Sequence, residues 1–167
     1  MSETTGVRLR APRERISRKA IPYWTVRALP GWLVLLVGEV LFKVLPADPP
    51  GTWLLVVIIV TAVLAVVHLA VMPSWRYRVH RWEVTPTAVY TQSGWIDQEW
   101  RVAPLSRIQT VDTERGPWEQ LFGLAKVTVT TASAAGPLHI HGLDLEVARG
   151  LVDELTAATE ASEGDAT

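Results

Sequence analysis

The stretch Thr52–Met72, TWLLVVIIVTAVLAVVHLAVM, decides the fold because it has 21 residues and no Asp, Glu, Lys or Arg. A helix of that length rises about 30 Å, the thickness of the hydrocarbon core of a bilayer. Trp53 and Trp75 bracket the stretch as interfacial aromatic residues, and Pro73 is expected to end the helix. A buried helix of a soluble domain is the weaker alternative, because such apolar runs are usually shorter. We therefore predict a transmembrane span over 52–73.

A second span, 24–45, is predicted upstream, although its second half, WLVLLVGEVLFKVL, contains Glu39 and Lys43. These two residues are four apart with the acid first, so we expect them to form an ion pair within the helix. An intramembrane carboxylate can instead bind a proton or an ion, and this alternative stays open. The loop at 46–51, PADPPG, is too short for a domain, so the two spans form a hairpin.

The distribution of charge predicts the orientation of this hairpin. Residues 1–81 contain 11 Lys or Arg and 4 Asp or Glu, whereas residues 82–167 contain 5 and 13. Seven basic residues precede Trp32 and three follow the second span, while the loop at 46–51 has none. Because basic residues favour the cytoplasmic side, we predict a multi-pass protein of the inner (plasma) membrane with both termini in the cytoplasm.

After Trp75 the apolar residues alternate with a period of two, which is typical of strands. Six strands are predicted: 76–84, 88–93, 95–102, 107–114, 126–131 and 137–141. One helical turn is predicted over Pro117–Gly123, and Asp144 is expected to cap a last, amphipathic helix. The predicted core consists of the apolar members of these patterns: Leu121, Phe122, Leu124, Val127, Val129, Leu151 and Leu155.

Four motifs in this half resemble those of a known family. They are WEVTPTAVY (82–90), APLSRIQTV (103–111), LFGLAKVTVTTAS (121–133) and IHGL (140–143). Their order after two membrane helices is similar to that of the YdbS-like bacterial membrane proteins, which carry a bacterial pleckstrin-homology (PH) domain. The resemblance covers roughly Ile16–Glu160. It implies an antiparallel β-barrel or sandwich of seven strands, one more than the six predicted, closed by the C-terminal helix.

The predicted fold is thus membrane-anchored α+β, with four parts along the chain. A basic cytoplasmic arm occupies 1–23 and is expected to be disordered before about Ile16. The transmembrane hairpin occupies 24–73 and the PH-like domain 74–160, followed by a disordered tail at 161–167. The small, acidic composition that predicts disorder in the tail begins at Thr159.

Catalysis is not expected, because the sequence contains no GxSxG, P-loop or GxGxxG motif. No cofactor or metal is expected either. His139 and His141 share one strand face with Asp144 close behind, but the packed or solvated interpretation of these histidines is the stronger one. Two carboxylate pairs are expected on solvated strand faces: Asp97 with Glu99, and Asp112 with Glu114.

The predicted partners are the lipid bilayer and either a membrane protein or a second copy of the chain. Lipid headgroups are expected to contact four basic residues: Arg13, Arg15, Arg18 and Lys19. Phosphoinositide binding is not expected, because the turn Thr85–Thr87 lacks the basic residues of phosphoinositide-binding PH domains. Nucleic-acid binding is not expected because the domain is acidic.

We therefore predict a tethered binding or scaffold module that organises a membrane protein complex from the cytoplasmic face. The residues expected to contact the partner are three tryptophans: Trp95, Trp100 and Trp118. The alternative is a small subunit of a transport or envelope-stress complex that acts through the hairpin and Glu39.

The orientation can be tested by cysteine labelling, since the chain has no native cysteine. With both termini in the cytoplasm, an Asp48→Cys variant should react with an impermeant maleimide added to intact cells, because the loop faces outward. A Ser162→Cys variant should react only after the membrane is permeabilised. The reverse pattern would contradict the orientation.

Overall fold

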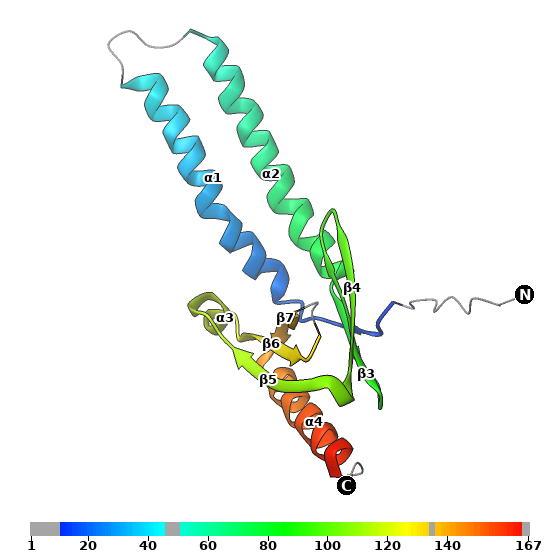
Figure 1. The fold of residues 1–167 in the computed structure, drawn as a ribbon. Helices are drawn as coiled ribbons and strands as arrows, with labels where there is room; N and C mark the ends of the chain where they lie inside the picture. The colour runs from blue at the N-terminus through cyan, green and yellow to red at the C-terminus, as the bar shows by residue number, and fades with distance from the viewer. Residues whose placement is uncertain (1–10, 46–50, 134–135, 165–167) are drawn as a thin grey trace, which may run out of the picture.

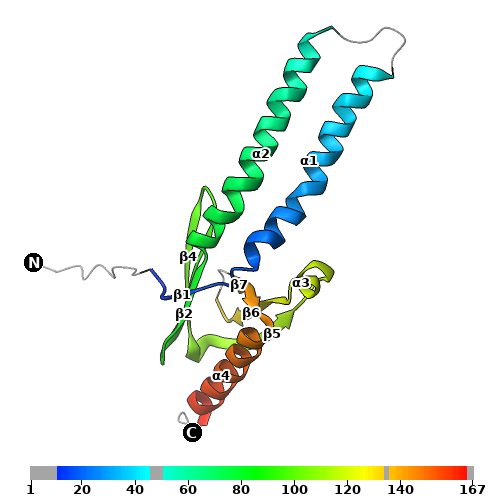
Figure 2. The same cartoon turned by 180° about the vertical axis from the view of Figure 1, so that it is seen from behind.

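The computed structural model describes residues 11–45, 51–133 and 136–164, with side chains as far as Glu160. The predictions for residues 1–10, for most of the interhelical loop and for 165–167 lie outside this described part. Figures 1 and 2 show a long helical hairpin that projects from one end of a β domain, with the last helix at the other end. The elements in chain order are β1 (Glu14–Arg15), α1 (Ala20–Val44), α2 (Trp53–Val79), β2 (Arg81–Val84), β3 (Ala88–Gly94), β4 (Gln98–Pro104), η1 (Leu105–Arg107), β5 (Ile108–Glu114), α3 (Pro117–Leu121), β6 (Leu124–Thr131), β7 (Leu138–Asp144) and α4 (Leu145–Gly164).

The two helices of the hairpin, α1 and α2, are long and apolar enough to cross a membrane. Large apolar side chains cover their outer faces, as at Val34, which is 74% exposed, and Ile59, which is 63% exposed. Water would leave this surface unfavourably hydrated, whereas the acyl chains of a bilayer cover it. Helices of spanning length are therefore confirmed at both predicted positions.

The prediction that Pro73 ends the second helix is wrong, because α2 continues to Val79 with Pro73 buried inside it. Proline removes one backbone donor from a helix, but the residues after it still form their own bonds. The backbone N–H of His80 accordingly donates to the carbonyl of Arg76 at 2.8 Å. The strand predicted over 76–84 therefore begins only at Arg81.

The strand missing from the sequence-based count is β1, which precedes the hairpin. Glu14 pairs with Trp82 and Arg15 with Arg81 in an antiparallel ladder with β2. Pro12 and Ile16, on either side of β1, are buried. The prediction of a separate, disordered arm before Ile16 is thus wrong for the described residues from Pro12 onward. The hairpin is inserted between the first and second strands of the domain.

The described strands form two antiparallel sheets, with orders β1-β2-β3-β4 and β5-β6-β7. No ladder joins the two sheets among the described residues, so the domain is a sandwich rather than a closed barrel. Helix α4 packs on β5, β6, β7 and η1. The predicted architecture, a PH-like sandwich closed by a C-terminal helix, is therefore confirmed.

The core lies between the sheets, α4 and the start of α1. Five predicted core residues are buried, with exposed fractions of 2% or less: Leu124, Val127, Val129, Leu151 and Leu155. Phe122 is half-buried against this core, whereas Leu121 is 72% exposed and was predicted wrongly. The single turn of α3 turns Leu121 outward because a helix so short has no continuous apolar face.

The C-terminal helix is longer than predicted. Helix α4 runs to Gly164, so the prediction of disorder is wrong for residues 159–164. The hydroxyl of Thr156 donates a hydrogen bond to the Val152 carbonyl, and the hydroxyl of Thr159 donates one to the Thr156 carbonyl, each at 2.8 Å. Such bonds satisfy small polar side chains without ending the helix.

Shortening a buried side chain of the core should lower the free energy of unfolding. Leu151→Ala removes a side chain that is 2% exposed, so the free energy of unfolding should fall by about 2–5 kcal/mol. The matched control is Val147→Ala on the same helix, where Val147 is 45% exposed and the loss should stay near 0.5 kcal/mol. Equilibrium unfolding of the full chain in detergent measures both, and equal losses would contradict the packing of α4.

Candidate functional site

The junction between the hairpin and the domain is an apolar contact built from the first turns of α1. Ala20 is fully buried and Trp24 is 5% exposed, both in the same core as β6, β7 and α4. The chain before α1 lies across Gly142 of β7, where the N–H of Ser17 donates to the Gly142 carbonyl at 2.8 Å. Gly142 has φ +73°, and a Cβ there would approach Ala20 Cβ to 3.2 Å. Glycine thus permits this close approach.

A polar network links α1 to α3 beside this contact. The hydroxyl of Tyr23 donates to Glu119 Oε1 at 2.5 Å, and Arg27 donates to the same hydroxyl at 2.7 Å. Burial alone would raise the pKa of Glu119, but the hydrogen bond from Tyr23 and the charge of Arg27 outweigh it. The pKa of Glu119 is therefore lowered, and its carboxylate stays ionised.

The end of α2 meets the same region through an aromatic and cationic stack. The guanidinium carbon of Arg76 lies 4.4 Å from the centre of the Trp24 ring. The centre of the His80 ring lies 5.2 Å from the centre of the same Trp24 ring. His80 is 4% exposed, and its Nδ1 lies 2.8 Å from the carbonyl of Arg76. Burial lowers the pKa of His80 to about 4, because the charged ring would lose its hydration.

The three predicted contact tryptophans lie in different surroundings. Trp95 directly follows β3, and the centre of its ring lies 5.6 Å from the centre of the His68 ring of α2. The backbone carbonyl of Trp95 accepts a hydrogen bond from the indole N–H of Trp75. Trp100 is half-buried on β4. Trp118 is 44% exposed on α3, beside the exposed Leu121. Figure 1 shows the β3–β4 hairpin running alongside α2.

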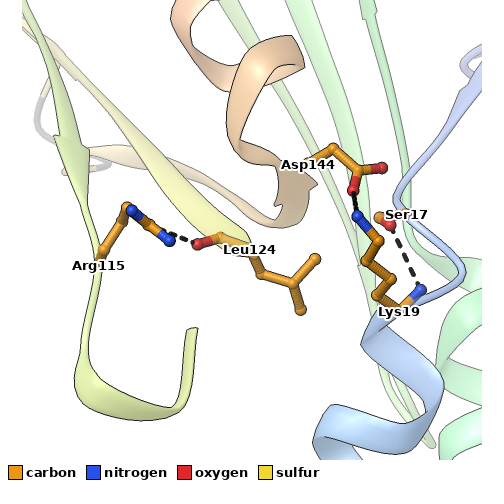
Figure 3. Close-up of polar contacts among 5 residues, drawn as sticks. All are labelled: Ser17, Lys19, Arg115, Leu124 and Asp144. Carbon is orange, nitrogen blue, oxygen red and sulfur yellow. Dashed lines mark hydrogen bonds and ion pairs between the residues drawn. The ribbon is translucent and has the colours of Figure 1, made fainter. Parts of the chain in front are cut away.

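The four basic residues predicted to contact lipid have different partners in the structure. Lys19 Nζ lies 2.6 Å from Asp144 Oδ1, and Figure 3 shows this ion pair beside Ser17. Asp144 directly precedes α4, at the position predicted for its cap, and its carboxylate accepts a hydrogen bond from Lys19. This bond lowers the pKa of Asp144 and joins the start of α1 to the end of β7. Figure 3 also shows Arg115 donating to the Leu124 carbonyl, which holds the ends of β5 and β6 together.

Arg13 forms an exposed ion pair with Glu83 at 3.6 Å, and the guanidinium of Arg15 lies 6.0 Å from the ring of Tyr77. Arg18 is exposed and forms no ion pair within the described part of the chain. Lipid contact by these residues stays a prediction. The carboxylates bound to Arg13 and Lys19 reduce the charge that those two can offer.

The expected ion pair between Glu39 and Lys43 is wrong. Glu39 Oε1 accepts a hydrogen bond from Thr61 of α2 at 2.9 Å, while Lys43 donates to the Gly51 carbonyl at 3.4 Å. The second oxygen, Glu39 Oε2, is buried and has no hydrogen-bond partner among the described residues. The neighbouring helix thus supplies a hydroxyl that the single-helix pattern could not reveal.

The histidine pair forms no metal centre in the described residues, where no group of three potential ligands is close enough. The rings of His139 and His141 lie 5.8 Å apart, and Asp144 is bound to Lys19. All four carboxylates are exposed, but only Asp112 and Glu114 share a strand as predicted, because Asp97 lies in the turn before β4. Two of the four form ion pairs: Glu99 with Arg101 and Glu114 with Lys126.

The chain is similar to a known protein family and to one curated protein. A family model described as the bacterial PH domain matches residues 33–159, about three quarters of the chain. The chain is therefore a membrane-anchored member of the bacterial PH-domain family.

Its similarity extends to the UPF0699 transmembrane protein YdbS of Bacillus subtilis (strain 168), with 31% identity over 101 residues. The match covers 60% of this chain and 62% of that relative, which is less than two thirds of the relative's length. The YdbS-like resemblance of the sequence is thereby confirmed. No solved structure matches the chain significantly.

No motif in the sequence marked the four junction residues Tyr23, Arg27, Arg76 and Glu119 as a site. Arg27 and Arg76 were counted only as signals of topology. Their positions next to the ends of the two spans were a usable signal, because the ends of an antiparallel hairpin must lie side by side. The partnership of Tyr23 with Glu119 had no signal, since it depends on how α3 packs against α1.

The buried His80 predicts a specific dependence of stability on pH. The folded pKa of about 4 lies below the usual value of 6.5, so between these values the unfolded chain binds a proton that the folded chain does not. Lowering the pH from 7 to 5 should therefore cost about 2 kcal/mol of stability through this group. His80→Asn, which keeps a donor near the Nδ1 position, should remove that part of the loss. Thermal unfolding in detergent at pH 8, 7, 6 and 5 measures it, and identical pH profiles would contradict the assignment.

Proposed function

We propose that the chain is a tethered binding and scaffold module that organises a membrane protein complex from the cytoplasmic face of the bacterial inner (plasma) membrane. The hairpin crosses the membrane twice in this proposal, with both termini in the cytoplasm. The role is non-catalytic in this proposal, because the sequence carries no GxSxG, P-loop or GxGxxG motif.

One observation carries this proposal: the domain is built around the base of the hairpin. Strand β1 enters the sheet before the first helix, and Ala20 and Trp24 of that helix are buried in the domain core. A flexible tether would allow the domain to rotate, whereas this packing fixes one face toward the bilayer. Fixed tethering also raises the effective concentration of the domain for partners in the same membrane.

The charge at the domain end of the hairpin supports the cytoplasmic placement. Arg76, Arg78 and Arg81 follow the apolar part of α2 directly, and Arg27 lies at the corresponding end of α1. Basic residues flanking spans are retained on the cytoplasmic side.

The partner-binding surface in this proposal centres on α3. Trp118 and Leu121 expose 44% and 72% of their surfaces, next to the hairpin base where a membrane partner would lie. An exposed aromatic residue beside an apolar one is typical of a contact centre between proteins. Trp95 and Ile96, the latter 80% exposed, form a second apolar site at the tip between β3 and β4.

A protein partner is favoured over a phosphoinositide by the turn between β2 and β3. Thr85 closes this turn by accepting from the Ala88 N–H and donating to the Ala88 carbonyl, and the turn contains no basic residue. A polyphosphorylated headgroup would find no cationic donor there.

A second candidate function rests on the buried oxygen of Glu39. An unpaired carboxylate oxygen at membrane depth is costly and is often part of an ion or proton path. In this alternative the chain is a small subunit of a transport or envelope-stress complex, and the hairpin performs the function.

Crosslinking followed by purification from native membranes tests the scaffold proposal. Trp118→Ala should reduce recovery of the crosslinked partner, or of a second copy, at least tenfold, because truncating a contact-centre tryptophan commonly costs 2 kcal/mol or more. Trp53→Ala is the matched control, since Trp53 is also exposed but lies at the opposite end of α2. Equal recovery from both variants would contradict a contact at α3.

Glu39→Gln separates the two candidate functions in the same experiment. The scaffold proposal expects partner recovery to be unchanged by this variant, because Gln can still accept the hydrogen bond from Thr61. Loss of recovery with Glu39→Gln and retention with Trp118→Ala would instead support the hairpin subunit.

A further inference from the structure

We propose that the base of the hairpin binds the phosphate group of an anionic phospholipid, in a cavity between α1, α2 and the β6–β7 face of the domain. The ligand chemistry is a singly charged phosphate diester, and its source is the inner leaflet that surrounds the hairpin. This proposal rests on the hairpin crossing the membrane and does not depend on the protein partner.

The cavity has a volume of about 350 Å³. The ionisable residues that line it come from five elements: Tyr23 and Arg27 of α1, Arg76 of α2, Glu119 of α3, Lys126 of β6 and His141 of β7. A second cavity of about 510 Å³ shares Arg27, Glu119, Lys126 and His141 with it and extends along α3 to Trp118. The two cavities are therefore parts of one hollow that starts at the hairpin base.

The cationic side chains in this hollow differ in their partners. Lys126 lies 2.6 Å from Glu114, and Glu119 accepts its hydrogen bond from the Tyr23 hydroxyl. Neither Arg27 nor Arg76 forms an ion pair with any carboxylate in the part of the chain that the structure describes. Two guanidinium groups thus face one cavity without a direct ion pair, and the carboxylate in that cavity, Glu119, is linked to Arg27 only through the Tyr23 hydroxyl.

This arrangement costs free energy unless an anion is bound. Arg76 is half-buried over the ring of Trp24, so part of its guanidinium is removed from solvent, and the like-charged Arg27 lines the same cavity. A phosphate between the two would compensate both effects. Arg27 uses one N–H for Tyr23, and a guanidinium has five, so donors remain for phosphate oxygens.

The position of the cavity selects a lipid rather than a soluble phosphate as the source. Arg27 and Arg76 lie where each apolar helix meets the domain, which is the level of the headgroup phosphates when the hairpin spans the bilayer. Trp118 lies along the same hollow, and tryptophan is enriched at this depth in membrane proteins. The apolar faces of the helices directly beyond the arginines would accommodate the acyl chains.

Lipid retention by the delipidated full chain tests the proposal. The protein is held in nonionic micelles with phosphatidylglycerol or phosphatidylcholine at low mole fraction, so that no charged surface is present, and native mass spectrometry counts bound lipids. The wild type should retain one phosphatidylglycerol in preference to phosphatidylcholine. Arg27→Gln combined with Arg76→Gln should weaken this binding about thirtyfold, and Arg27→Gln alone about fivefold.

The matched control combines Arg78→Gln with Arg107→Gln, which removes the same charge from two exposed positions outside the cavity. This control should change the affinity less than twofold. Equal weakening in both double variants, or equal retention of the two lipids, would overturn the proposal. If the Arg27 and Arg76 double variant unfolds, the single Arg27→Gln variant, at an exposed position, decides the outcome.

A competition arm identifies the source of the phosphate. Millimolar inorganic phosphate or glycerol 3-phosphate should leave phosphatidylglycerol bound, because these compounds lack the acyl chains that contact the helices. Displacement of the lipid by either compound would refute the lipid assignment in favour of a soluble phosphate ligand. Partner recovery with Trp118→Ala is measured separately, so a failure here does not count against the scaffold proposal.

Discussion

The burial of the first turns of α1 inside the domain is the interaction on which the rest of the structure depends. Ala20 is fully buried and contacts the strand that carries Gly142, whose missing side chain allows the backbones to approach. Trp24 extends this contact to α2 through Arg76 and His80. Loss of this packing would leave the hairpin and the sandwich joined by chain connectivity alone, and the cavity between them would have no fixed shape.

The same contact means that the residues after α2 do not include the whole domain. A fragment beginning after α2 would lack β1, Ile16 and Trp24, and so would expose one edge of the sheet and part of the core. Exposed edges favour pairing between chains, and lost core residues reduce the free energy of unfolding. Folding of the domain therefore involves the whole hairpin, because β1 pairs with β2 although α1 and α2 lie between them in the sequence.

The sequence predicted what depends on long, regular patterns. The charge-free run 52–72 indicated a span, and the alternation after Arg81 indicated most of the strands. Short or exceptional features were missed for physical reasons: β1 has two residues and hence no period, and Pro73 sits inside a helix whose later residues still form their own bonds. Contacts between elements could not be predicted from the pattern of a single helix. The hydrogen bond from Thr61 to Glu39, for example, forms only because α1 and α2 pack together.

The net charge of a sequence segment likewise did not predict the charges that lie together at the candidate site. The acidic excess of residues 82–167 predicted repulsion of anions by the whole domain, yet much of that excess lies on α4, at the end of the domain away from the hairpin (Figures 1 and 2). Charges separated by more than a Debye length, about 8 Å at physiological ionic strength, scarcely affect one another. The cavity at the hairpin base is lined instead by Arg27 and Arg76 of the two helices and by Lys126 of β6, together with one carboxylate, Glu119 of α3. An acidic net charge of this half of the chain is therefore compatible with the anion site that we propose at the hairpin base.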